Sequence, residues 1–152
     1  MTWGVHKRRA LDPRTAPTRV YRKKPTEHDH QSAYFDLVRL HMPNCKLIYA
    51  VPNAQLAGKY LIVRHLQAEG LTSGVPDVNI DYARGGYNGM RIEFKRDEKQ
   101  EPSDEQIEAH KQLRREGYLV EVHHDPEQAW ARTRQYLRGE IVREFARAEA
   151  GE

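Results

Sequence analysis

Residues 74–95, from Gly74 to Lys95, read GVPDVNIDYARGGYNGMRIEFK and contain the strongest indication of the fold. Apolar and polar residues alternate from Asp77 to Tyr82, and residues 90–95 (MRIEFK) form a second short run of the same kind, which is typical of strands. Three glycines lie between the two runs, within residues 83–89, and favour a tight connection. The stretch therefore predicts a β-hairpin.

The two predicted strands bring charged residues together. If the hairpin turns about Gly85 and Gly86, Asp77 lies opposite the region of Phe94 and Lys95. Glu93 and Lys95 are two residues apart and share a face of the strand. Pro76 cannot donate a ladder hydrogen bond, so the strand begins at Asp77, at the edge of the sheet.

Two carboxylates and one ammonium group at a strand end suit a hard divalent cation. Mg²⁺, or Mn²⁺ in its place, binds through one or two carboxylates together with waters and substrate phosphate. Such an ion polarises a phosphodiester and activates a water, while Lys95 stabilises the charge that develops on the phosphate. The alternative is that Asp77, Glu93 and Lys95 form an ordinary surface salt bridge on a hairpin.

The rest of the chain alternates predicted helices and strands around this hairpin. Thr26 is a plausible N-cap for the first helix, and Gly70 and Gly117 are good helix ends. The order predicts an α/β fold, a sandwich with a mixed central sheet flanked by helices. The expected elements are a helix over 26–41, a strand over 46–51, a helix over 57–69, the hairpin, a helix over 103–116, a strand over 118–123 and a helix over 126–137.

Composition narrows the class of protein. The chain has 152 residues, of which 38% are hydrophobic and 31% charged. No apolar run approaches the roughly 18 residues of a membrane span, and no apolar segment follows the basic N-terminus as in a secretory signal. The single cysteine, Cys45, excludes an internal disulfide and a cysteine-cluster zinc site. We therefore expect a soluble, intracellular protein.

The net charge of +3 is unevenly distributed along the chain. Residues 1–24 contain eight Lys or Arg and one acid, Asp12, whereas the remainder is slightly acidic. A basic arm over 1–25 is typical of proteins that bind nucleic acid, because Lys and Arg release counterions from phosphates. The alternative is a disordered, solubilising tail.

The hairpin motifs resemble a known family. Gly74-Val75-Pro76-Asp77, then residues 85–89 (GGYNG) and Ile92-Glu93-Phe94-Lys95, are similar to the core of the VRR-NUC nucleases, a branch of the PD-(D/E)xK superfamily with a restriction-endonuclease-like fold. The likeness continues through residues 27–31, 48–53, 103–106 and 117–120, and it covers about 26–138. We expect residues 26–138 to form the nuclease domain.

The resemblance implies roles for individual residues. Asp77 and Glu93 are expected to bind the metal, with the main-chain carbonyl of Phe94 as a third ligand. Lys95 is expected to be the catalytic lysine, and Glu27 an additional acidic group near the metal.

Two glutamines are expected to shape the site or to touch the nucleic-acid backbone. Gln31 lies with Glu27 on the helix stripe that Tyr34 and Val38 bury, although the first turn alone could explain Glu27. Gln106 either only caps its helix, as part of a capping box, or also points toward the sheet along the face that it shares with His110 and Leu113.

Three further features have both a functional and an ordinary interpretation. Tyr87 and Arg84 in the hairpin loop are candidate contacts to substrate, or simply residues of a turn. The pairs His28/His30 and His123/His124 have spacings that disfavour a chelate.

Residues 139–152 are expected to form a C-terminal helical extension, with one apolar face composed of Ile141, Val142, Phe145 and Ala148.

The combined expectation is a metal-dependent endonuclease that hydrolyses DNA phosphodiesters. The resemblance to small phage and bacterial members implies a homodimer in the cytoplasm that acts on branched DNA such as four-way junctions. Residues 54–56 (AQL) depart from the family, which usually carries a Gly-Gly-Arg-like run there, so a DNA contact from that loop is in doubt. The alternatives are a non-catalytic nucleic-acid-binding module and a nuclease that acts on flaps, single strands or RNA.

Overall fold

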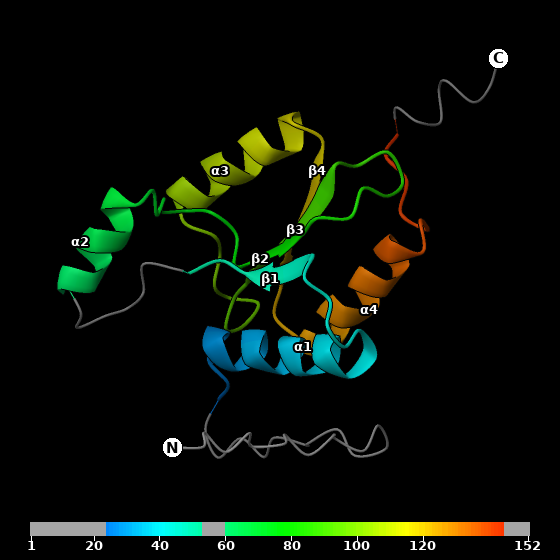
Figure 1. Ribbon diagram of the computed structural model, residues 1–152, viewed down its shortest axis with the longest axis horizontal. Helices are drawn as coiled ribbons and strands as arrows, with labels where there is room; N and C mark the ends of the chain where they lie inside the picture. Colours follow the sequence, from blue (N-terminus) through cyan, green and yellow to red (C-terminus); the bar gives the residue numbers. More distant parts are fainter. Residues whose placement is uncertain (1–23, 53–59, 145–152) are drawn as a thin grey trace, which may run out of the picture.

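A four-stranded sheet forms the centre of the molecule, with helices on both faces (Figure 1). The computed structural model describes residues 24–52 and 60–144. Helices α1 and α4 cover one face of the sheet, α3 covers the other, and α2 lies to the side (Figure 1). The basic arm, except for Lys24 and Pro25, and residues 54–56 fall outside the described part of the chain.

The elements follow the predicted order. Strand β1 pairs with β2 and β2 with β3 in antiparallel fashion, whereas β3 and β4 are parallel. The sheet is therefore mixed, in the order β1-β2-β3-β4, and the predicted restriction-endonuclease-like α/β class is confirmed. The bounds are α1 (Glu27–His41), β1 (Ile48–Ala50), α2 (Tyr60–Ala68), β2 (Val78–Ile80), β3 (Gly89–Phe94), α3 (Asp104–Arg115), β4 (Tyr118–His123) and α4 (Pro126–Leu137).

Local signals explain where the helices begin. Thr26 caps α1 as predicted, in a capping box with Asp29. Ser103 caps α3 in the same way, and Asp125 caps α4 just before a proline in its first turn. The helix starts therefore lie close to the predicted ones.

The register of the hairpin differs from the prediction. Val78 pairs with Ile92 and Ile80 with Met90, so the next position along sets Asp77 opposite Glu93 rather than opposite Phe94 and Lys95. The turn itself is tight, because Arg84 and Tyr87 exchange two backbone hydrogen bonds. Between this turn and the β2–β3 ladder, however, three residues (81–83) on one side lie opposite two residues (88–89) on the other. This extra residue acts as a bulge and shifts the register by one position.

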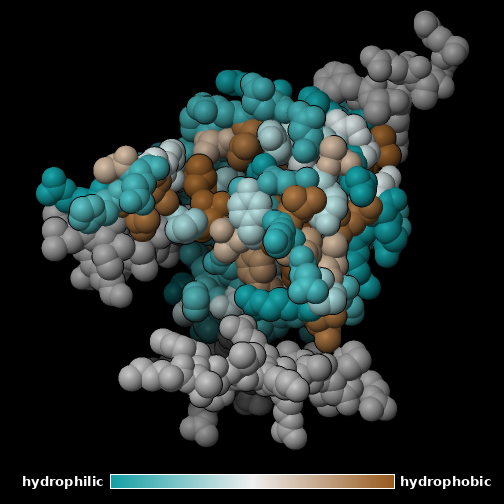
Figure 2. Space-filling model, in the orientation of Figure 1, coloured by the Kyte–Doolittle hydropathy of each residue, from teal (hydrophilic) through white to brown (hydrophobic). Residues whose placement is uncertain are grey.

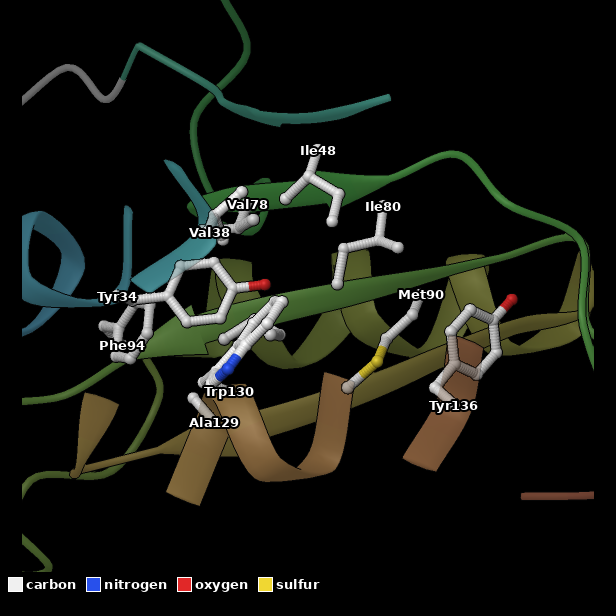
Figure 3. Packing of buried hydrophobic residues seen from close by; sticks show 11 residues of the cluster. Tyr34, Val38, Ile48, Val78, Ile80, Met90, Phe94, Ala129, Trp130 and Tyr136 are labelled. Carbon is white, nitrogen blue, oxygen red and sulfur yellow. The ribbon is translucent and has the colours of Figure 1, made fainter. Parts of the chain in front are cut away.

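The apolar core lies between the sheet and the α1–α4 layer. Alternate residues of β2 and β3 point into it, and the ring of Tyr34 packs against Phe94 and Trp130 (Figure 3). Tyr34 and Phe94 are fully buried. The buried cluster comprises Tyr34, Val38, Ile48, Val78, Ile80, Met90, Ile92, Phe94, Ala129, Trp130 and Tyr136.

The predicted C-terminal helix does not begin at Ile141. Helix α4 ends at Leu137, Gly139 turns the chain with φ +74°, and residues 141–144 run on without helical structure. This segment crosses the hairpin turn, where the amide of Arg143 donates to the carbonyl of Gly85 at 2.8 Å. A Cβ atom on Gly85 would lie 1.9 Å from the carbonyl oxygen of Ile141. Hydrogen bonding to the hairpin thus replaces helix formation, and Phe145 and Ala148 lie outside the described residues.

A groove of about 760 Å³ opens between α2 and α3. Its walls include Leu66, Val75 and Leu113, and Asn79 and Arg91 of the sheet also line it. Figure 2 shows apolar surface, in brown, between α2 and the body of the molecule. Within the described part of the chain, no helix is long and apolar enough to cross a membrane.

Candidate active site

Asp77 lies where β2 begins, directly after the buried Pro76. Its side chain is only 6% exposed, and its Oδ2 accepts a hydrogen bond of 2.7 Å from the amide of Phe94. This bond ties the carboxylate to the end of β3. Asp77 is therefore held at the sheet edge where the sequence places it.

The main-chain carbonyl of Phe94 points toward the side of the strand on which Asp77 lies. The amide of Lys95 donates to the carbonyl of His123 on β4, so the carbonyl of Phe94, which belongs to the same peptide group, points the other way, toward β2. The ladder partner there is Pro76, which has no N–H to donate. The carbonyl of Phe94 consequently meets no ladder donor from Pro76 and is available beside Asp77.

The side chains of Glu93, on β3, and Lys95, just after it, point away from the apolar core and lie under α3. Lys95 Nζ lies 3.2 Å from Glu93 Oε1 and 3.9 Å from Glu27 Oε1. Glu93 is 1% exposed and Lys95 is 4% exposed. Glu27 reaches the lysine from the first turn of α1. The structure thus brings together the three carboxylates and the lysine that sequence analysis selected.

Gln106 satisfies both interpretations of its position. Its Oε1 accepts from the amide of Ser103 at 2.9 Å, which completes the capping box. The same oxygen accepts from Lys95 Nζ at 2.8 Å, and Nε2 donates to Glu93 Oε1. Gln106 therefore links the start of α3 to the charged pair on β3.

The start of α3 is fixed closely over the sheet. Gly74 adopts φ +81°, and a Cβ atom there would lie 2.8 Å from the backbone of Glu105. The loop that leads to Asp77 therefore packs directly against the first turn of α3. On the other side, Gln31 of α1 donates a hydrogen bond of 3.4 Å to the carbonyl of Asp77.

Charge at the site is unbalanced. Burial, together with the nearby charge of Glu93, raises the pKa of Asp77 to about 7. The carboxylates of Glu27, Asp77 and Glu93 share one ammonium group, that of Lys95. An additional positive charge would allow all three carboxylates to ionise.

The residues present fit a divalent cation. Glu93 Oε2 and Glu27 Oε1 are buried, and neither has a hydrogen-bond partner among the described residues. Buried carboxylate oxygens of this kind need a proton donor or a cation. Within the described ranges, no group of three or more Asp, Glu, His or Cys side chains is placed so that it could hold a metal ion by itself. Mg²⁺ does not require one, since two carboxylates, a main-chain carbonyl and waters suffice.

Arg84 and Tyr87 lie at the other end of the hairpin and are not part of this cluster. Arg84 Nε donates to the carbonyl of Leu137 at 3.2 Å, and its guanidinium lies over the ring of Tyr82. Tyr87 packs near Tyr136, with ring centroids 6.4 Å apart. Both side chains thus hold α4 to the turn, and their predicted contact with substrate stays a prediction.

His110 is the site residue that sequence analysis did not select. It lies one turn after Gln106 on α3, is 2% exposed, and its Nε2 is 3.8 Å from Glu93 Oε2. The four-residue spacing from Gln106 was the available signal. The other histidines singled out have separate contacts: His28 with Ser32, His30 with the carbonyl of Arg96, and His123 with Glu121.

Comparison with known proteins identifies the fold. A solved structure named "VRR_NUC domain protein" is similar, with a TM-score of 0.60 and 28% sequence identity. The match covers 76% of this chain and 91% of that one. The chain has the fold of a VRR-NUC domain. No family model and no curated protein matches the sequence.

This similarity shows that the described residues form a nuclease-like domain. It confirms the family resemblance on which the expected residue roles were based.

Proposed function

We propose that the protein is a metal-dependent endonuclease that hydrolyses DNA phosphodiester bonds with Mg²⁺ or Mn²⁺. The convergence of buried Asp77, Glu93 and Lys95 at one edge of the sheet is the observation that carries the proposal. Burying three charged side chains without a function is costly. The VRR-NUC fold around them supports the same activity.

The cation would be held by the carboxylates of Asp77 and Glu93 and by the carbonyl of Phe94, with Glu27 as a further acidic group beside it. When bound, the cation polarises the phosphodiester and lowers the pKa of an attacking water. The hydrogen bond from the Phe94 amide to Asp77 orients one carboxylate, and Gln106 orients the other.

Lys95 would supply positive charge where negative charge develops on the phosphate. Its ammonium group is held by Gln106 and Glu93 and is therefore pre-positioned. Gln31, bonded to the peptide carbonyl of Asp77, would keep the start of β2 in place or touch the nucleic-acid backbone. Arg84 and Tyr87 would at most contact a part of the substrate beyond the cluster.

We further propose that the substrate is branched DNA and that the active species is a homodimer. Two copies related by a two-fold axis would set two sites across a symmetric four-way junction. Residues 26–138 would form the nuclease domain, 1–25 a basic arm on DNA, and 139–152 an extension. The eight basic residues in the first 24 positions support the contact with DNA.

The test is cleavage of a labelled four-way junction, a flap and a plain duplex by the full chain. Each substrate is incubated with Mg²⁺, with Mn²⁺ and with EDTA. We expect metal-dependent cutting, fastest on the junction, and a loss of at least 100-fold in Lys95→Ala. Lys111→Ala, which removes an exposed lysine of α3, is the matched control and should cut like the wild type. Binding without cutting under every metal would overturn the enzymatic proposal.

The principal alternative is a non-catalytic nucleic-acid-binding module with the same fold. Its binding would depend on the basic arm, so a variant that lacks residues 1–24 separates the two. The nuclease proposal predicts that this variant binds DNA more weakly and with less salt dependence, yet still cuts. Cutting of flaps, single strands or RNA in preference to junctions would retain the enzyme and change its substrate.

A further inference from the structure

His110 and Glu93 face each other with unsatisfied polar atoms. Both residues are almost completely buried, at 2% and 1% exposure. Nε2 of His110 lies 3.8 Å from Oε2 of Glu93, and neither atom has a hydrogen-bond partner among the described residues. Native proteins rarely leave two such groups unpaired, because each costs free energy comparable to a lost hydrogen bond.

The other oxygen of Glu93 is already held from the same helix. Gln106 Nε2 donates to Oε1, and Lys95 Nζ lies 3.2 Å from that atom. Gln106 and His110 are one helical turn apart on α3 and therefore point the same way. One turn of the helix thus directs a side-chain nitrogen toward each oxygen of a single carboxylate, with Gln106 bonded to Oε1 and His110 facing Oε2.

The position of α3 over Glu93 is set at both ends of the helix. Its first turn packs on Gly74 and is closed by the capping box of Ser103. Near its end, Arg114 donates a hydrogen bond of 2.9 Å to the carbonyl of Val120 on β4. The proximity of His110 to Glu93 is therefore built into the packing of α3 on the sheet.

We propose that His110 is a positioning residue that fixes the carboxylate plane of Glu93 for cation binding. At 3.8 Å, Nε2 of His110 lies just beyond hydrogen-bonding distance of Oε2, and a small approach would let an N–H there donate to that oxygen while Gln106 holds Oε1, so that Glu93 keeps its orientation toward Asp77. Donors of this kind, bonded to a metal-binding carboxylate, commonly change metal affinity 10- to 100-fold when removed. The inference rests on the proposed function, because it assigns Glu93 to a cation.

The test measures Mg²⁺ binding by calorimetry and the Mg²⁺ concentration that gives half-maximal cleavage. His110→Leu removes the donor and retains an apolar side chain that fills the space, so we expect Mg²⁺ binding to weaken about tenfold. The cleavage rate at saturating Mg²⁺ should stay within a few-fold of the wild type, and the melting temperature of the metal-free protein should not fall. His110→Gln, which retains a donor, should recover most of the affinity.

Two results separate the failure of this inference from the failure of the proposed function. If the wild type binds Mg²⁺ and cuts DNA, and His110→Leu does so at the same Mg²⁺ concentrations, His110 does not position Glu93. If the wild type neither binds Mg²⁺ nor cuts, the endonuclease proposal itself is wrong. His65→Leu removes an exposed imidazole on α2 and should leave Mg²⁺ binding unchanged.

Discussion

The two faces of the sheet carry opposite kinds of side chain from the same strands. Along β3, Ile92 and Phe94 point into the apolar layer with α1 and α4, whereas Glu93 points under α3. All three residues are at most 1% exposed. The burial of Glu93 is therefore no less complete than that of its apolar neighbours, and only its surroundings differ. One face is built for stability, and the other retains charge at the expense of stability.

The largest expected effect comes from neutralising the charged face. Glu93→Gln retains the size of the side chain and removes its charge, so DNA cleavage should fall about 1,000-fold, which corresponds to about 4 kcal/mol of activation free energy. The stability of the metal-free protein should be unchanged or higher, because three carboxylates share the ammonium group of Lys95 and the substitution removes part of this excess negative charge. Cleavage kinetics and urea unfolding measure the two quantities. Glu98→Gln, in the exposed loop after β3, is the control and should cut normally.

A substitution on the next residue of β3 should have the opposite consequence. Phe94→Ala leaves a cavity in the core and should lower the free energy of unfolding by about 3–5 kcal/mol. Urea unfolding without metal measures this loss. Arg96→Ala, at an exposed position two residues later, should change stability by less than about 0.5 kcal/mol. A Phe94→Ala protein as stable as the wild type would contradict the division of the sheet into two faces.

The charged face should also make stability depend on pH. The pKa of Asp77 is about 7 in the folded protein, above its ordinary value of 3.8, so the folded state retains a proton that the unfolded chain releases. Asp77 therefore lowers metal-free stability as pH rises from about 4 to about 7, by at most about 1.4 kcal/mol per pH unit. The difference between wild type and Asp77→Asn, followed by thermal unfolding, isolates this slope. Saturating Mg²⁺ should raise the melting temperature most above pH 7.

The smallest expected effect concerns a polar pair within the apolar face. The hydroxyl of Tyr34 lies 3.0 Å from that of Thr133, and burial raises the pKa of this tyrosine far above its usual value. Thr133→Val should cost about 1–3 kcal/mol, because it leaves the tyrosine hydroxyl buried and unpaired. Adding Tyr34→Phe should recover most of that loss. If the double variant is less stable than Thr133→Val alone, the pair is not what stabilises this part of the core.

Features of the fold that depend on neighbouring residues could be predicted from the sequence, whereas features that depend on contacts between distant segments could not. Helix starts at Thr26 and Ser103 depend on side chains within three residues of the cap, so local sequence was enough. The hairpin register was predicted wrongly, because the bulge over residues 81–83 depends on how both strands meet β1 and β4. Residues 141–144, where a helix was expected, are not helical for a similar reason, since Gly85 of a distant turn bonds Arg143 instead.

The candidate site shows the same difference between features set by local sequence and features set by contacts between distant segments. Asp77, Glu93 and Lys95 were selected from spacing within one hairpin. The roles of Glu27 and Gln31 came from the family resemblance, with their place on a helical stripe as further support. Gln106 remained undecided between a cap and a contact with the sheet, because both roles are compatible with its position in the sequence. The four-residue spacing from Gln106 places His110 on the same face of the helix, but it does not show that Glu93 lies opposite, so His110 was not selected.

Local sequence patterns were sufficient to predict the order of the elements and the hairpin with its charged edge, and to find the resemblance to VRR-NUC domains. The elements and the hairpin follow from periodicity and capping, which act over a few residues along the chain, whereas the resemblance rests on short motifs. Only the tertiary structure decided that Asp77 bonds the amide of Phe94, and that Gln106 and His110 face the two oxygens of Glu93. Such contacts depend on how α3 and β2 pack on β3, and packing is settled by all the surrounding residues at once.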